Sequence, residues 1–244
     1  MVEIRKEPKH TAAKLLIYGL SGAGKSTLAA TVGKPLILDV ENGGNYLKAD
    51  VVEQKQLDSY EKFYKVLVEI YHQAEAGKLE YDNIVIDSID ELVRMLEAKL
   101  GGATDTKDMK ATIYNGDGAY GNGKKFMENE IRLRLFRFLD LFTKYNVGIT
   151  LVAHANQKKL LDSEGSHVDT VAPKMDEYLM NLFVEHMDFV YYLKNVEGER
   201  KLVLESDGTV LAKNRVHRTS EVSLKDYDIN DLLLPESEVK KRGK

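Results

Sequence analysis

Gly19-Leu20-Ser21-Gly22-Ala23-Gly24-Lys25-Ser26-Thr27 is a stretch with the spacing G-x-x-x-x-G-K-S/T. This spacing is typical of a glycine-rich loop that wraps a phosphate group with its own backbone N–H groups. The preceding residues 14–18 form a short apolar run with strand character, and residues 28–32 can continue as a helix. We therefore expect a phosphate-binding loop between a strand and a helix.

The residue types of this loop match the requirements of a nucleotide. Glycines allow positive φ angles and leave space for phosphate oxygens. We expect Lys25 to contact the β- and γ-phosphates and the Ser26 hydroxyl to bind Mg²⁺. The predicted nucleotide-binding residues are Gly19, Ser21, Gly22, Ala23, Gly24, Lys25, Ser26 and Thr27. The alternative is a glycine-rich turn that only joins a strand to a helix.

The composition is that of an ordinary globular protein. The chain has 244 residues, 43% of them hydrophobic and 30% charged, which is enough for one large α/β core. The net charge of -4 does not indicate a nucleic-acid-binding surface over the whole molecule, so any such surface must be local. The sequence contains no cysteine, which excludes disulfides and thiolate metal sites, and its six histidines show no ligand spacing.

The ends of the chain show no targeting segment. Residues 1–10 are charged and include Pro8, unlike a signal peptide, and no apolar run is long enough to cross a membrane. We therefore expect a cytoplasmic protein with no membrane partner.

Strand and helix patterns alternate along most of the chain, which predicts an α/β fold with a mostly parallel sheet and helices on both faces. Predicted strands cover residues 36–40, 51–52, 84–87 and 147–153, and predicted helices cover 58–77, 88–100, 131–142 and 175–187. Residues 189–193, 201–205 and 209–212 are predicted as antiparallel edge strands. Residues 101–124 and 155–173 are expected to be long loops.

Three of the predicted strands end in a chemically useful side chain. Asp87 follows an apolar strand and is a candidate to hold Mg²⁺, with Ser26 as the other protein ligand. Glu41 is the candidate general base, its alternative being a solvated carboxylate or a helix cap. His154 is a candidate to contact the γ-phosphate or the attacking water, although a lone histidine is as often an ordinary polar residue.

Two cations follow the last predicted edge strand. Lys213 and Arg215 occupy alternate positions of an extended segment, so their side chains are expected to point the same way. Positive charge on the transition state is one requirement of phosphoanhydride hydrolysis, which makes the pair a catalytic candidate. The alternative is a pair of cations that only contributes to solubility.

The order of these features resembles the RecA-like ATPase core, and it looks closest to phage-encoded RecA-core ATPases of single-strand annealing and recombination. The resemblance spans about residues 14 to 216 and rests on the glycine-rich loop, Glu41, Asp87-Ser88, Ala153-His154, the segment 114–123 and Lys213-Asn214-Arg215. It implies DNA-stimulated ATP hydrolysis, with ATP and Mg²⁺ bound between subunits of a ring or filament. Lys213 and Arg215 would then reach the γ-phosphate of a neighbouring subunit.

The same resemblance implies single-stranded DNA as a partner, together with a single-strand binding protein or another recombination protein. DNA would lie on the two long loops, where the candidate contacts are Tyr114, Tyr120, Lys124, Lys125, Lys158 and Lys159. Lysines follow a nucleic-acid backbone and aromatic rings stack on bases, although lysines on a loop also serve solubility.

The expected organisation is an N-terminal segment 1–13, a RecA-like ATPase domain 14–216 and a tail or partner-docking segment 217–244. Two other functions stay open at this point. One is a P-loop small-molecule kinase with Arg132, Arg134 and Arg137 as lid arginines, and the other is a replicative helicase or helicase loader.

Overall fold

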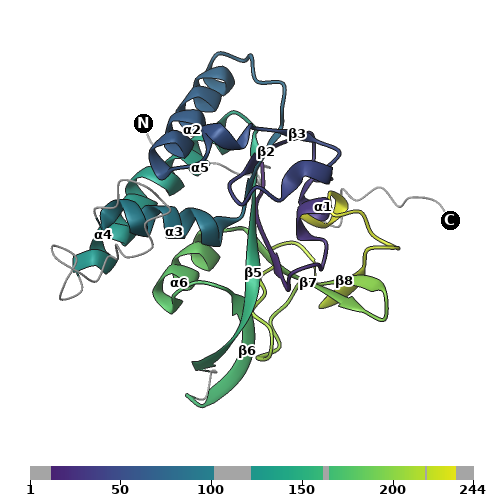
Figure 1. Cartoon of the computed structure of the whole chain (residues 1–244). Helices are drawn as coiled ribbons and strands as arrows, with labels where there is room; N and C mark the ends of the chain where they lie inside the picture. Colours follow the sequence, from purple (N-terminus) through teal and green to yellow (C-terminus); the bar gives the residue numbers. More distant parts are fainter. Residues whose placement is uncertain (1–11, 102–121, 162–164, 218, 235–244) are drawn as a thin grey trace, which may run out of the picture.

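The computed structural model describes residues 12–101, 122–161, 165–217 and 219–234. The described residues form one sheet of nine strands with helices packed against it (Figure 1). The strand order is β3-β2-β4-β5-β1-β7-β8-β9, and β6 pairs with β5 outside this path.

Six strands form the parallel part of the sheet, and β1 lies inside it between β5 and β7. These strands are β1 (Lys14–Gly19), β2 (Pro35–Asp39), β3 (Asp50–Val51), β4 (Asn83–Asp87), β5 (Gly148–Leu161) and β7 (Phe189–Val196). β1 and β4 are apolar runs that are buried on both faces, as expected for strands covered by helices on each side.

The side chains of β1 alternate between two separate hydrophobic clusters, which therefore lie on opposite faces of the sheet. Leu16 and Tyr18 belong to the larger cluster, and Leu15 and Ile17 belong to the smaller one. Helices cover both faces, so the predicted fold class is confirmed: the chain is an α/β protein with a mostly parallel sheet, helices on both faces and antiparallel strands at one edge.

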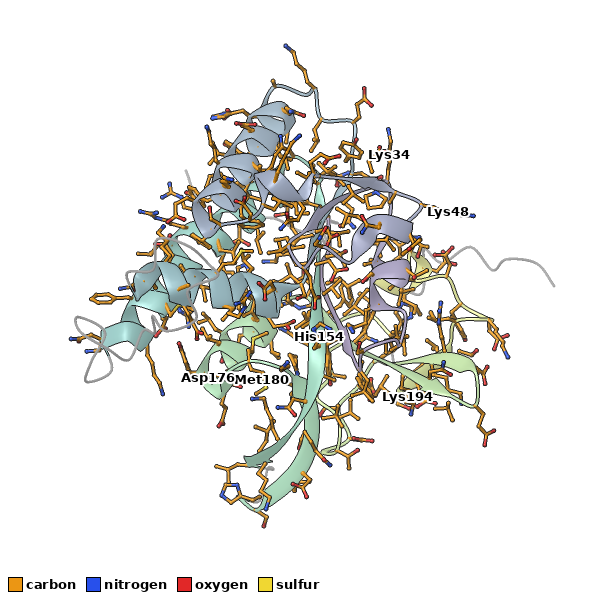
Figure 2. All side chains as sticks on the ribbon, in the orientation of Figure 1. Lys34, Lys48, His154, Asp176, Met180 and Lys194 are labelled. Carbon is orange, nitrogen blue, oxygen red and sulfur yellow. The ribbon has the colours of Figure 1, made fainter. Side chains whose placement is uncertain are left out.

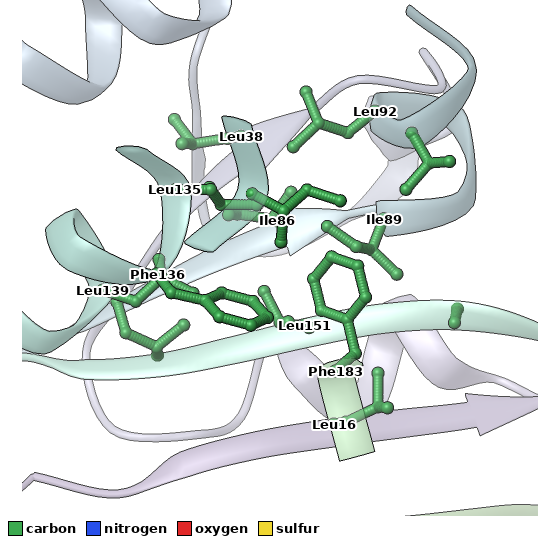
Figure 3. Close-up of a cluster of buried hydrophobic side chains, with 14 of the residues drawn as sticks. Leu16, Leu38, Ile86, Ile89, Leu92, Leu135, Phe136, Leu139, Leu151 and Phe183 are labelled. Atoms are coloured by element: carbon green, nitrogen blue, oxygen red, sulfur yellow. The ribbon is translucent and has the colours of Figure 1, made fainter. Parts of the chain in front are cut away.

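The larger cluster lies under most of the helices, on the left of the sheet in Figure 1. These helices are α2 (Tyr60–Glu75), α3 (Ile89–Leu100), α4 (Asn122–Glu130), the π-helical stretch η4 (Ile131–Phe136), α5 (Arg137–Lys144) and α6 (Glu177–His186). Figure 3 shows Phe136 and Phe183 meeting over Leu151, with ring centroids 5.2 Å apart in an edge-to-face arrangement. Within the described ranges, none of the helices combines the length and apolar character needed to span a bilayer.

The smaller cluster lies under α1 (Lys25–Ala29) and residues near the C-terminus. Val222, Ile229 and Leu232 are buried in it, and the Tyr191 hydroxyl donates to the carbonyl oxygen of Leu232 at 3.1 Å. Residues 219–234 of the segment predicted as a tail therefore pack onto the sheet. The sequence does not predict this packing, because the aspartates and the asparagine that form turns between the buried apolar residues make the segment look polar.

The antiparallel strands are β6 (His167–Pro173), β8 (Glu199–Val203) and β9 (Glu221–Ser223). β8, which overlaps the predicted strand 201–205, extends the edge beyond β7, and β9 extends it further although the sequence predicted a tail there. Residues 189–193 form a strand as predicted and pair antiparallel with β8, but the prediction of an edge strand was wrong, because β7 lies inside the sheet and pairs in parallel with β1. Residues 209–212 form only isolated bridges, at Val210 and at Lys213 just beyond them.

The predicted loop 155–173 is instead a pair of strands, because β5 continues to Leu161 and pairs with β6 from Ala155 onward. This pair projects away from the helices (Figure 1). Both faces of this pair are partly exposed to solvent, so the sequence lacks the alternation of apolar and polar residues by which a strand is recognised. Of the other predicted loop, residues 102–121 lie outside the described residues and residues 122–124 begin α4.

The remaining short helices are η1 (Gly44–Tyr46), η2 (Gln54–Gln56) and η5 (Asp231–Leu233). η1 lies between β2 and β3, and η2 lies between β3 and α2.

Candidate nucleotide-binding site

The glycine-rich loop connects the end of β1 at Gly19 with the start of α1 at Lys25. Gly22 and Gly24 have φ angles of 77° and 95°, in the left-handed region that side chains disfavour. Ser21 lies between β1 and Gly22, Ala23 lies between the two glycines, and Thr27 lies in α1. The strand, loop and helix thus occur in the predicted order.

Lys25 is a buried cation at the centre of this loop, with a relative exposure of 6%. Its ammonium donates to the carbonyl oxygen of Leu20 at 3.0 Å. Burial lowers the pKa of Lys25, and the nearby carboxylates of Asp87, Asp90 and Glu41 oppose this shift. An ammonium that is desolvated and aimed into a phosphate loop is suited to bind an anionic ligand.

Asp87 ends β4 and faces Ser26 of the loop. The Ser26 side chain lies close enough to the Asp87 carboxylate to lower its pKa. Burial raises the pKa of Asp87 above its ordinary value; Ser26 and Lys25 oppose this rise, while Asp39 and Glu41 add to it.

A hydroxyl and a carboxylate oxygen are ligands that Mg²⁺ prefers, so Ser26 and Asp87 fit the metal expected with a nucleotide. Across the described residues, no group of three His, Cys, Asp or Glu side chains could hold a metal ion. The remaining ligands of Mg²⁺ at Ser26 and Asp87 would therefore be phosphate oxygens and water, which is usual for this ion.

His154 lies beside the loop because the sheet register places it opposite Gly19. Figure 2 shows it on β5, near the middle of the molecule. Its Nδ1 is 2.9 Å from Asp90 Oδ2, and its backbone N–H donates to Asp90 Oδ1 at 3.1 Å. Its Nε2 is 3.8 Å from Glu41 Oε1. The carboxylate of Asp90 thus holds one side of the imidazole and leaves the other side facing Glu41.

The structure brings together four of the predicted residues: Lys25, Glu41, Asp87 and His154. They come from α1, the end of β2, the end of β4 and β5. Glu41 is partly exposed, with 44% of its side chain accessible, so water can reach its carboxylate.

The sequence prediction missed two carboxylates of this region. Asp39 is buried, and its two oxygens accept hydrogen bonds from the backbone N–H groups of Gly43 and Gly44 at 3.1 and 2.7 Å. These bonds close the turn that carries Glu41. Asp90 holds His154, and its only sequence signal is an acid in the first turn of a helix that follows a strand.

Lys213 and Arg215 do not join the four residues. The Lys213 ammonium donates to the carbonyl oxygens of Val184, Glu185 and Met187, at the end of α6. Arg215 is more than half exposed and pairs with Asp188 at 3.0 Å. Lys213 forms a β-bridge with Val190, whereas Gly19 of the phosphate loop pairs with Leu193, three residues further along β7. Lys213 therefore lies about 10 Å from the phosphate loop along the strand direction, toward the opposite end of the sheet.

The predicted DNA contacts lie in two elements. Lys124 and Lys125 are in α4, and Lys158 and Lys159 are in β5. The Lys124 ammonium lies 5.3 Å from the centre of the Tyr178 ring, and the Lys158 ammonium donates to the carbonyl oxygen of Met175. Tyr114 and Tyr120 lie outside the described residues.

The arginines of the kinase alternative lie on the helical run from η4 to α5. Arg132 and Arg134 pair with Glu128 and Glu130 one turn earlier, at 2.9 and 3.1 Å. The region of Arg132 and Arg137 forms a cavity with His186, which lies away from the phosphate loop. Neither observation favours a lid over a bound nucleotide.

Comparisons with known proteins show the family of this chain. A family model described as an AAA domain matches residues 11–216, which include the whole phosphate loop and the other site residues. The flagellar accessory protein FlaH from Methanocaldococcus jannaschii is similar over 79% of this chain and 76% of its own, with 14% sequence identity and a TM-score of 0.41. No curated protein sequence matches the chain significantly. Because the family model covers most of its length, this chain belongs to the AAA domain family of P-loop proteins.

Proposed function

We propose that this protein binds ATP with Mg²⁺ and hydrolyses it to ADP and phosphate. The observation that carries the proposal is the meeting of Lys25, Glu41, Asp87 and His154 at the end of β1. A phosphate loop alone binds nucleotides, whereas a carboxylate with access to water beside it provides a base for hydrolysis.

In this mechanism the loop and Lys25 hold the triphosphate, and Ser26 and Asp87 hold the metal ion. Mg²⁺, when bound, neutralises charge on the β- and γ-phosphates. Glu41 accepts a proton from the attacking water, whose oxygen forms a bond to the γ-phosphorus as the bond to the β-phosphate oxygen breaks. Because the Asp90 carboxylate can only accept, His154 donates its Nδ1–H to Asp90, which fixes the orientation of the ring. In the neutral ring Nε2 then accepts a hydrogen bond from the attacking water, and only a protonated ring would donate from Nε2 to a γ-phosphate oxygen or to Glu41.

We further propose that the ATPase works on single-stranded DNA, as a cytoplasmic assembly with ATP between subunits. Support comes from Arg215, which is exposed and lies away from the loop of its own chain, where a neighbouring copy has access to it. The Lys213 ammonium already binds three carbonyl oxygens, so in this proposal Arg215 is the cation that crosses the interface.

The decisive experiment measures ATP hydrolysis with and without single-stranded DNA, while light scattering reports the mass of the assembly. We expect hydrolysis that DNA stimulates and a mass above that of one chain. Lys25→Ala should abolish hydrolysis and most of the affinity for triphosphate. If the wild-type protein binds no nucleotide, the proposal is wrong, and if DNA changes neither rate nor nucleotide affinity, the DNA part of it is wrong.

A mixing experiment tests the interface. Arg215→Ala should bind ATP and fail to turn it over, and mixing it with Glu41→Ala should restore some activity. The restored activity would come from sites that combine the intact Glu41 of one variant with the intact Arg215 of the other. Absence of rescue at every ratio would show that each site is built within one subunit.

A further inference from the structure

Arg200 of β8 lies directly against the phosphate loop. A Cβ atom built on Gly24 would be 2.8 Å from the Arg200 Cζ and 2.9 Å from its Nε and Nη2. Since these three atoms are almost equally distant, the flat face of the guanidinium covers this position of the loop. Gly24 directly precedes Lys25, so the guanidinium lies next to the residues expected to hold phosphate.

The β7–β8 pair forms a wall beside the loop. β7 pairs with β1 up to Leu193, opposite Gly19, and Asn195 near the end of β7 pairs with Arg200. A cavity of about 340 Å³ lies between residues 20–23 of the loop and residues 192–195 of β7. Figure 2 shows Lys194 on this side of the molecule. This cavity lies beside the phosphate loop, and Asn195, one of its lining residues, is the β7 residue that pairs with Arg200.

The charge of Arg200 is uncompensated, unlike that of its neighbours. Lys194 and Lys201 both pair with Glu221. The backbone carbonyl of Arg200 accepts a hydrogen bond from the N–H of Leu224, but its exposed guanidinium makes no hydrogen bond or ion pair with any residue that the structure describes. An unpaired guanidinium beside backbone N–H groups that point into an anion cradle gains favourable interactions when an anion binds.

We propose that Arg200 binds the phosphate chain of the nucleotide held by the loop of the same chain. This inference rests on the nucleotide site proposed above and adds a residue to it. The guanidinium presents paired N–H donors whose geometry matches phosphate oxygens. Arg200 thus acts within one subunit, in contrast to Arg215, which is proposed to act on a neighbouring subunit.

The test compares Arg200→Ala with Lys201→Ala as the matched control. Both variants remove one positive charge from adjacent positions of β8, but neighbouring residues of a strand point to opposite faces, so only Arg200 faces the loop. Calorimetry would measure the affinity of each protein for ADP with Mg²⁺ and for inorganic tripolyphosphate with Mg²⁺. Thermal unfolding would confirm that both variants remain folded.

We expect Arg200→Ala to weaken binding of both ligands about tenfold, the effect of losing one charge-assisted hydrogen bond at an accessible site. Lys201→Ala should bind both ligands as the wild type does. An unchanged affinity of Arg200→Ala would overturn the inference, and so would a loss for ADP without a loss for tripolyphosphate, which would indicate a contact to the nucleoside. If the wild type binds neither ligand, the proposed nucleotide site itself fails, and the two failures are thereby distinguished.

Discussion

At the scale of single residues, the site combines groups that burial makes unfavourable on their own. Lys25 and Asp87 carry charge in a region that is mostly shielded from water, and burial shifts the pKa of each toward its neutral form. Their partial compensation by each other and by Ser26 keeps them usable for binding. Buried charged groups of this kind lower the free energy of unfolding of the free protein, and a bound ligand that interacts with them raises it again.

Asp87→Asn tests this cost. Because the pKa of Asp87 is raised in the folded state, the folded protein retains this proton to a higher pH than the unfolded chain does, and the charged form destabilises the fold at neutral pH. We expect the variant to gain about 0.5–2 kcal/mol of unfolding free energy at neutral pH and to lose ATP hydrolysis. Urea unfolding would show the gain disappearing in acid, where Asp87 is protonated in both states; a variant less stable than the wild type at neutral pH would contradict it.

Asp90→Asn tests whether the carboxylate positions His154. The amide retains the shape of Asp90 but weakens its hold on the imidazole, so we expect kcat for ATP to fall about tenfold or more while KM changes little. Glu91→Gln is the matched control, since Glu91 is the next acid of the same helix and pairs with Arg94 instead. Equal rates in the two variants and the wild type would show that Asp90 has no positioning role.

At the scale of elements, the end of α6 depends on a side chain that sequence reasoning placed in catalysis. The three carbonyl oxygens that Lys213 binds belong to the last turn of this helix, where they lack partners within the helix. A cation at a helix C-terminus also interacts favourably with the helix dipole. The two cations at alternate positions therefore have different roles: Lys213 binds carbonyl oxygens at the end of α6, and Arg215 pairs with Asp188.

Lys213→Met should cost about 1–3 kcal/mol of unfolding free energy, because it leaves these partly buried carbonyls without a donor. Arg215→Ala should change stability by less than about 0.5 kcal/mol, since its ion pair with Asp188 is exposed. Chemical denaturation of both variants measures the difference. Equal stabilities would show that Lys213 does not cap α6.

Some elements followed from the sequence and others did not. Buried strands such as β4 are continuous apolar runs, and the loop after β1 has a spacing that few other structures require. The part of β5 beyond His154 and the paired strand β6 were missed, because strands exposed to solvent on both faces carry no apolar alternation. Asp90 was overlooked because an acid in the first turn of a helix is already explained by its favourable interaction with the helix dipole.

At the scale of the whole molecule, residues 219–234 complete the smaller hydrophobic cluster that lies under α1. Asn230 accepts a hydrogen bond from the backbone N–H of Gly33 at 2.8 Å and donates to the carbonyl oxygen of Thr31 at 2.9 Å. These long-range contacts join the segment that follows β9 to the turn after α1. Sequence patterns describe local periodicity, so a contact of this separation leaves no signal in them.

Leu232→Ala should therefore cost about 2–5 kcal/mol of unfolding free energy, the range for emptying a buried leucine site. Leu234→Ala is the matched control, because Leu234 is 39% exposed and should lose much less. Urea denaturation would measure both. Similar small losses would show that this segment does not contribute to the core.

The position of Glu41 provides the most direct test of hydrolysis at this site, because a carboxylate beside the γ-phosphate is what separates an ATPase from a nucleotide-binding protein. The measurement is single-turnover ATP hydrolysis by Glu41→Gln, with nucleotide affinity determined on the same protein. We predict that the variant binds ATP with Mg²⁺ as the wild type does and hydrolyses it at least about 100-fold more slowly. Hydrolysis at the wild-type rate would contradict the assignment of Glu41 and, with it, the proposed convergence of Lys25, Glu41, Asp87 and His154 on one nucleotide.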